Sequence, residues 1–316
     1  MRDVTIMSGS SPICVRDHGG EGPPLLLIHG AGGNLAAMGS LPACLAEKFR
    51  VIVPDLRGHG HTDGGPWDWD GVLDDLQGVV DAFGFARPFV AGLSLGGMLA
   101  ALWAARHPDC PGAVSLDGNP PVSRVDQLDA LDDAAAELAR LTELFDGMEA
   151  MMAAPLTDEL RGAMEAGYRA TARHHGADEE LFAEAFRRSV VDDRLRPDAD
   201  LTRQLRTAMN ALDLMPVYRK VRCPLLLVLA TTDMPEQVPF HDLYEAYRRH
   251  VRSRLSTLDN PWVTVMPLEG SSHAMHAERP GELATLIASW VDSVHCGQTG
   301  SAGSAGTQRI SNSHSE

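Results

Sequence analysis

The sequence predicts an α/β protein with one large hydrophobic core. Three observations support this: buried-strand runs, helix-like runs, and a length of 316 residues with 44% hydrophobic and 22% charged residues, which is ordinary globular composition. The runs typical of buried strands are short and apolar and lie at residues 24–28, 50–54, 87–91, 113–116, 223–230 and 262–266. Helix-like runs, such as residues 95–106, are rich in Ala, Leu and Met.

The strand-like run at 87–91 leads into a serine flanked by glycines, Gly92-x-Ser94-x-Gly96. A serine on a tight strand-to-helix turn has a strained backbone, and glycines two residues away let the strand and helix approach each other. Such a turn exposes the hydroxyl and directs the next amide, that of Leu95, and the positive end of the helix toward it. The pattern predicts a nucleophile, Ser94. A Gly/Ser turn without chemistry is the alternative.

The run at 24–28 opens into a glycine-rich loop, His29-Gly30-Ala31-Gly32-Gly33-Asn34. Acyl transfer needs a second backbone donor that faces the nucleophile, and the amide of Ala31 is the candidate. The loop lacks the Gly-Lys-Ser/Thr ending of a phosphate-binding loop and the Gly-x-Gly-x-x-Gly dinucleotide pattern. We therefore predict an oxyanion hole formed by Ala31 and Leu95.

The next strand-like run ends in Asp55-Leu-Arg57-Gly-His-Gly, and Asp55 and Arg57 are expected to form an ion pair or a hydrogen-bonding brace for this loop. The order of strand, His-Gly loop, strand, Asp-Leu-Arg-Gly-His-Gly, strand and Gly-Leu-Ser-Leu-Gly-Gly resembles the α/β-hydrolase superfamily over most of the chain. The resemblance implies a mostly parallel eight-stranded sheet with helices on both faces, an inserted helical cap, and a triad in the order Ser, acid, His.

The two remaining triad members are sought at the ends of later strands. Asp233 follows the run at 223–230, and it is the preferred acid by motif match. Asp117, after the run at 113–116, is the alternative acid, because some members of the superfamily carry it there. His273, in the loop after the run at 262–266, is the predicted general base.

Strand-like runs disappear between residues 120 and 215, where helical segments take over. We predict core segments at 1–119 and 216–295, a helical cap at 120–215 and a disordered Gly/Ser-rich tail at 296–316. Cap residues of this kind commonly shape a substrate pocket. The candidate pocket residues are Gly30, Gly32, Phe145, Met148, Met152 and Met234. For Phe145, Met148 and Met152, packing inside the cap is the alternative interpretation.

A net charge of −16 disfavours nucleic acid or an anionic membrane as a partner. The five cysteines are scattered without metal-ligand spacing, which is typical of free thiols, and the first residues do not have the pattern of a signal peptide. We expect a cytoplasmic protein that needs no metal or organic cofactor. A homodimer is left open.

The motifs predict a serine hydrolase that cleaves a small-molecule carboxylic ester or lactone through an acyl-enzyme. They resemble those of small-molecule esterases, enol-lactonases and carbon–carbon bond hydrolases that act on diketones, and they do not separate these activities. A thioesterase or acyltransferase would use the same triad. A ligand receptor on a hydrolase scaffold is a further alternative.

Overall fold

A computed structural model describes residues 1–9 and 11–300 of the chain. Its main sheet has eight strands in the order β1-β2-β4-β3-β5-β6-β9-β10. Strand β2 runs antiparallel to both of its neighbours, β1 and β4, whereas β4, β3, β5, β6, β9 and β10 run parallel to one another. The strands are β1 (Arg2–Ser8), β2 (Ser11–Gly19), β3 (Pro24–Ile28), β4 (Arg50–Pro54), β5 (Phe89–Leu93), β6 (Ala113–Leu116), β9 (Leu225–Ala230) and β10 (Val263–Leu268). The predicted mostly parallel eight-stranded sheet is confirmed.

The central strands are apolar throughout because both faces of the sheet are covered. In β3, Leu26 and Ile28 point into the core on one face, and Leu25 and Leu27 into the core on the other. Helices α2 (Trp69–Ala82), α3 (Leu95–Arg106) and α8 (Met215–Lys220) pack on the first face. Helices α1 (Leu41–Leu45), α10 (Met275–Glu278) and α11 (Pro280–Gly300) pack on the second.

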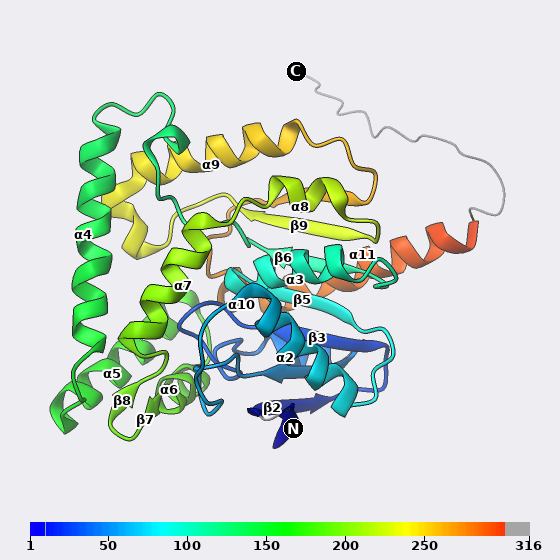
Figure 1. Ribbon diagram of the computed structural model, residues 1–316, viewed down its shortest axis with the longest axis horizontal. Coiled ribbons are helices and arrows are strands. Elements are labelled where there is room, and N and C mark those ends of the chain that lie inside the picture. Colours follow the sequence, from blue (N-terminus) through cyan, green and yellow to red (C-terminus); the bar gives the residue numbers. More distant parts are fainter. Residues whose placement is uncertain (10, 301–316) are drawn as a thin grey trace.

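Between β6 and β9 the chain forms mainly helices. These are α4 (Ala134–Met152), α5 (Asp158–His175), α6 (Glu179–Arg188) and α7 (Ala199–Ala211), with the short strands β7 (Val190–Val191) and β8 (Arg194–Leu195) and a 3₁₀ turn at Val125–Gln127. Figure 1 shows α4 to α7 gathered at one end of the sheet. After β9, a 3₁₀ segment at Pro235–Phe240 leads into α9 (His241–Ser256).

Three caps in this helical segment explain where its helices begin. The side chains of Thr157, Asp178 and Asp198 accept hydrogen bonds from the first free amides of α5, α6 and α7. α5 ends at Gly176, whose φ of +65° favours glycine. These local signals place helices inside the predicted cap region.

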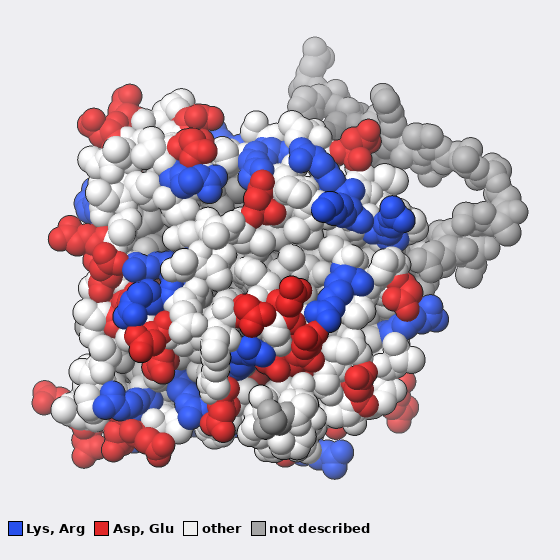
Figure 2. Space-filling model, in the orientation of Figure 1, with Lys and Arg blue, Asp and Glu red and all other residues white. Residues whose placement is uncertain are grey.

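The last helix, α11, extends to Gly300, so residues 296–300, which were expected in a disordered tail, are helical. The rest of the predicted tail, residues 301–316, lies outside the described residues. Within the part of the chain that the structure describes, no helix combines the length and apolar character needed to cross a bilayer. On the face in Figure 2, basic side chains form a run at the upper right and acidic side chains cluster near the centre.

Candidate active site

Ser94 occupies the turn between β5 and α3, with φ +55° and ψ −114°. This conformation is rare for a residue with a side chain, and the surrounding packing maintains it. A Cβ on Gly92 would lie 2.2 Å from the carbonyl oxygen of Gly96, and one on Gly96 would lie 2.3 Å from that of Ile28. The two glycines of the motif are therefore required by close backbone contact. Leu95 is the first residue of α3, so its amide has no acceptor within the helix.

The glycine-rich loop after β3 lies against Ser94. A Cβ on Gly30 would be 3.4 Å from the Cβ of Ser94. The amide of Gly33 donates to the carbonyl of Gly30, which closes a turn around Ala31 and Gly32, and Gly32 has a φ of +73°. Ala31 and Ser94 line the same two cavities, which is the placement that their predicted roles as oxyanion donor and nucleophile require.

Two buried histidines brace this loop. His29 donates from Nδ1 to the carbonyl of Gly30 at 2.8 Å and accepts at Nε2 from the amide of Leu56 at 3.0 Å. His59 accepts at Nε2 from the amide of Gly32 at 3.3 Å. Burial lowers the pKa of His29 to about 4 and that of His59 to about 3. Both rings are therefore neutral near pH 7, and their hydrogen bonds hold the loop.

His273 follows β10, and its Nδ1 donates to Oδ2 of Asp117 at 2.6 Å. Burial lowers the pKa of His273, but the hydrogen bond and charge of Asp117 outweigh it, so the pKa is raised. The pKa of Asp117 is lowered because the His273 contact outweighs its own burial. With Nδ1 committed to the carboxylate, Nε2 is left as the proton acceptor.

The prediction that Asp233 orients the histidine is wrong. Its carboxylate accepts from Nδ1 of His241 and from Nη1 of Arg248, each at 2.5 Å. Asp117, the alternative acid, takes the position instead. Its other oxygen accepts from the amide of Ala230 at 3.1 Å, which ties the acid to β9.

Sheet register explains this choice between the two acids. Leu116 in β6 pairs with Val228 in β9, so Asp117 comes one residue after its paired position. Asp233 comes five residues beyond Val228, where the chain has already left the sheet for the 3₁₀ segment. Asp117 has a φ of +45°, a conformation that aspartate tolerates better than most residues.

Two cavities meet at Ser94 and His273, and both residues line each of them. The first, of about 280 Å³, lies between the glycine-rich loop and the helical segment, and Tyr168 of α5 and Phe182 of α6 contribute to its wall. The second, of about 340 Å³, is also lined by Asp117. A substrate with its reacting carbonyl at Ser94 has room for one half on each side.

The predicted pocket residues divide between these cavities and the outside. Gly30 and Gly32 line the first cavity, and Phe145 and Met234 line the second. Met148 is 53% exposed and lines neither cavity, so its prediction as a pocket residue is wrong. The side chain of Met152 lies outside the described part of the structure.

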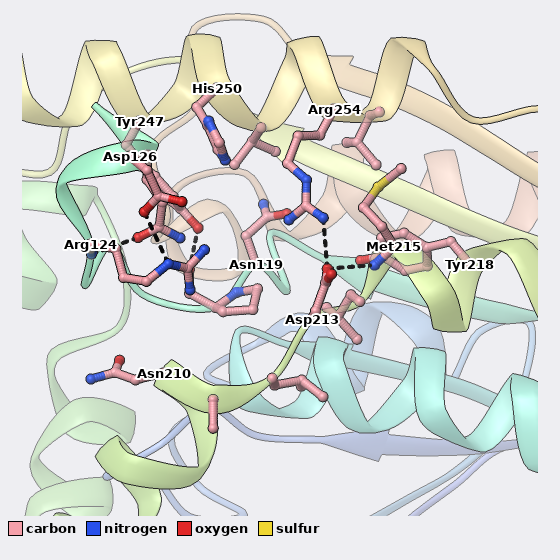
Figure 3. Close-up of a pocket in the computed structure, with 17 residues that line it drawn as sticks. Asn119, Arg124, Asp126, Asn210, Asp213, Met215, Tyr218, Tyr247, His250 and Arg254 are labelled. Carbon is pink, nitrogen blue, oxygen red and sulfur yellow. Dashed lines mark hydrogen bonds and ion pairs between the residues drawn. The ribbon is translucent and has the colours of Figure 1, made fainter. Parts of the chain in front are cut away.

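A third cavity, of about 480 Å³, lies beyond the wall that Asn119, Pro120, Tyr247 and Val251 share with the second. Figure 3 shows its charged side chains in ion pairs with one another, Arg124 with Asp126 and Arg254 with Asp213. Ser94 and His273 do not line it, so its larger volume does not make it the reactive site.

The helical segment is joined to the catalytic loops by buried polar contacts. Asn34 donates from Nδ2 to the carbonyl of Ala185 at 2.7 Å and to the hydroxyl of Ser189 at 2.9 Å. Arg188 of α6 pairs with Asp55, which is fully buried. The expected Asp55–Arg57 ion pair is therefore wrong, but the expected hydrogen-bonding brace is confirmed, because the Asp55 carboxylate accepts from the amide of His61 at 2.9 Å. Arg57 instead pairs with Asp75 on α2 at 2.8 Å.

Several residues of the site could not be recognised from their local sequence. Tyr168 and Phe182 come from helices whose pattern indicates only amphipathic packing, and Asn34 is one polar residue in a loop. Arg248 and Arg252 face the second cavity from α9. Their spacing of four residues, which places both on one side of a helix, was the available signal. Among the described residues, no group of His, Cys, Asp and Glu is arranged to hold a metal ion.

Comparison with known proteins agrees with this architecture. The profile of the Alpha/beta hydrolase family matches residues 25–286, and the chain belongs to this family. It is accordingly an enzyme, a hydrolase. It is 26% identical over 280 residues to 2-(acetamidomethylene)succinate hydrolase of Mesorhizobium japonicum, covering 86% of this chain and 89% of that protein.

Other similar proteins are named for different activities. A 2-hydroxymuconate semialdehyde hydrolase of Pseudomonas sp. is 33% identical over 138 residues, 40% of this chain and 48% of that protein. The crystal structure of the enol-lactonase from Burkholderia xenovorans LB400 superposes with a TM-score of 0.58 at 20% identity, over 92% of this chain and 100% of that one. At this identity the superposition shows the shared fold alone.

Proposed function

We propose that the protein is a serine hydrolase that cleaves a carboxylic ester or lactone of a small molecule through an acyl-enzyme intermediate. The observation that carries the proposal is the pairing of His273 with Asp117 beside cavities that Ser94 also lines. In this mechanism Ser94 attacks the carbonyl carbon and His273 accepts its proton at Nε2. Asp117 holds the ring and stabilises the imidazolium.

The negative charge that develops on the carbonyl oxygen needs donors already in place. The amides of Leu95 and Ala31 serve this purpose, because the first is the free end of α3 and the second belongs to the loop in contact with Ser94. Collapse of the tetrahedral intermediate expels the alcohol, which takes the proton from His273. Water then attacks the acyl-enzyme by the same path and frees Ser94.

The test is turnover of p-nitrophenyl esters of increasing acyl length, together with labelling by a fluorophosphonate. The wild type should be labelled and should release p-nitrophenolate, and Ser94→Ala should do neither. Ser123→Ala is a matched control, because Ser123 lines none of the cavities described above. Ester turnover that survives in Ser94→Ala would refute the proposal.

A carbon–carbon bond hydrolase is the second candidate, and similarity to the 2-hydroxymuconate semialdehyde hydrolase favours it. The same triad would then act on a diketone, and the leaving group would be a carbanion that must be protonated. Labelling by the fluorophosphonate without turnover of any ester, together with cleavage of a vinylogous diketone, would select this candidate. A thioesterase would instead release free thiol from an acyl thioester.

A further inference from the structure

The second cavity at Ser94 has an unusual charge for a protein with a net charge of −16. Of the residues that line it, Arg248 and Arg252 are cationic, and Asp117 is the one acid. Asp117 is already paired with His273. The two arginines are four residues apart on α9, so both guanidinium groups extend from the same side of the helix. Within the described part of the chain, the first cavity is lined by no lysine, arginine, aspartate or glutamate.

Arg248 is held rigidly by carboxylates that do not themselves line the cavity. Its Nε and Nη2 donate to Glu245 at 3.1 and 3.0 Å, and its Nη1 donates to Asp233 at 2.5 Å. A guanidinium has five N–H donors, so one remains on each terminal nitrogen. The Arg248 side chain is only 14% exposed and is thus fixed in orientation.

Arg252 is the more available cation. Its side chain is 45% exposed, and it donates to Glu245 at 3.2 Å through a single nitrogen. The polar side chains of Thr231, Thr232 and Gln237 share the cavity wall with it. Fixed, partly desolvated arginine donors recognise planar oxyanions such as carboxylates better than neutral groups.

We propose that Arg248 and Arg252 bind a carboxylate on the half of the substrate that occupies the second cavity. The substrate is then a small ester or lactone with a free carboxylate, and its other half is apolar and lies in the first cavity. This inference rests on the proposed function, since it takes the bond at Ser94 as the one cleaved. Arg248 and Arg252 line the same cavity as Ser94 and His273, so a carboxylate bound to them lies in the cavity that holds the reacting bond.

The experiment compares two matched substrate pairs. In the first pair, the p-nitrophenyl monoester of glutarate carries a carboxylate on the acyl side, and p-nitrophenyl valerate is its neutral counterpart. The pair of para-acetoxybenzoate and para-acetoxybenzamide places it on the leaving-group side. The wild type should prefer the anionic member of one pair in kcat/KM, and that pair identifies the half that lies against the arginines.

Arg248→Gln and Arg252→Gln should each lower the ratio of anionic to neutral kcat/KM by about 10- to 100-fold, the range for hydrogen bonds to charged groups. Arg249→Gln is the matched control. Arg249 also approaches Glu245, at 3.9 Å, is 49% exposed and does not line the cavity, so the ratio should stay unchanged. Neutral members preferred in both pairs, or ratios unchanged in both arginine variants, would overturn the inference.

Two further measurements keep the test decisive. If Arg248→Gln does not fold, Arg252→Gln decides alone, because it removes one hydrogen bond from a half-exposed side chain. If the wild type hydrolyses no ester, the proposed function fails, and the inference is tested by binding. A rise in the melting temperature with glutarate but not glutaramide, absent in Arg252→Gln, would support it. No rise with glutarate in the wild type would refute it.

Discussion

Asparagine substitutions at Asp117 and Asp233 test which carboxylate serves the catalytic histidine. Asparagine suits position 117, because it tolerates the φ of +45° there. Its Oδ1 would keep the hydrogen bond from the amide of Ala230. The amide nitrogen would then face His273 where the carboxylate oxygen now accepts a proton. A donor facing a donor favours the opposite tautomer of His273, with its proton on Nε2.

That tautomer cannot accept the proton of Ser94. Aspartate-to-asparagine replacement at the corresponding position of serine proteases costs about 10⁴-fold in kcat, which is about 5 kcal/mol of transition-state stabilisation. We expect a loss of this size in Asp117→Asn. For Asp233→Asn we expect kcat on a neutral ester to change by less than about fivefold, because its two partners, His241 and Arg248, lie outside the proposed triad.

The assay is steady-state hydrolysis of a neutral p-nitrophenyl ester, with the rate of fluorophosphonate labelling as a second readout. Melting temperatures measured in parallel separate lost chemistry from lost folding. The reasoning is refuted if Asp233→Asn loses activity as severely as Asp117→Asn while both remain folded. It is also refuted if Asp117→Asn keeps the wild-type labelling rate.

Three other predictions concern pH and stability. The kcat/KM of the wild type should rise with pH, with a midpoint above about 6.5, the ordinary pKa of histidine. The reaction needs neutral His273, and the contact with Asp117 raises the pKa of His273 despite its burial. A midpoint below this value in a pH–rate profile would contradict the prediction. Chemical denaturation should show Gly96→Ala less stable by about 3 kcal/mol or more, since the new Cβ meets backbone at 2.3 Å. Gly147→Ala, in open space on α4, should raise the free energy of unfolding by about 0.5–1 kcal/mol. If both alanine variants changed stability in the same direction and by the same amount, backbone contact would not be the cause of the loss in Gly96→Ala. Arg188→Ala should cost about 3 kcal/mol by leaving Asp55 buried without its cation, and an unchanged melting temperature would show that the pair does not anchor α6.

The proposed nucleophile and base could be located from the sequence because each position depends on local features. Ser94 lies in a five-residue pattern whose glycines are required by backbone contacts within the turn and with β3. His273 lies in the loop after the last apolar run. The sheet could be predicted for the same reason, since strands buried on both faces are continuous apolar runs.

The acid could not be chosen from the sequence, because both candidates follow an apolar run. The choice depends on how far β6 and β9 extend beside each other and on which cation lies near the second carboxylate. Neither the register of Leu116 against Val228 nor the position of Arg248 on α9 is visible along the chain. The expected Asp55–Arg57 ion pair was wrong for a similar reason, because Asp55 pairs with Arg188, which lies 133 residues away along the chain.

The position of the acid and the proposed recognition of a carboxylate have a common structural cause. Asp117 supplies the charge that His273 needs, so Asp233 is free to hold Arg248. If Asp233 turned toward His273 instead, Arg248 would lose one of its two carboxylate partners and part of the constraint on its orientation. The two acids therefore divide two tasks, the orientation of the base and the orientation of a cation in the cavity wall. Asp233→Asn should accordingly weaken the preference for anionic esters while sparing neutral ones, whereas Asp117→Asn should slow both alike.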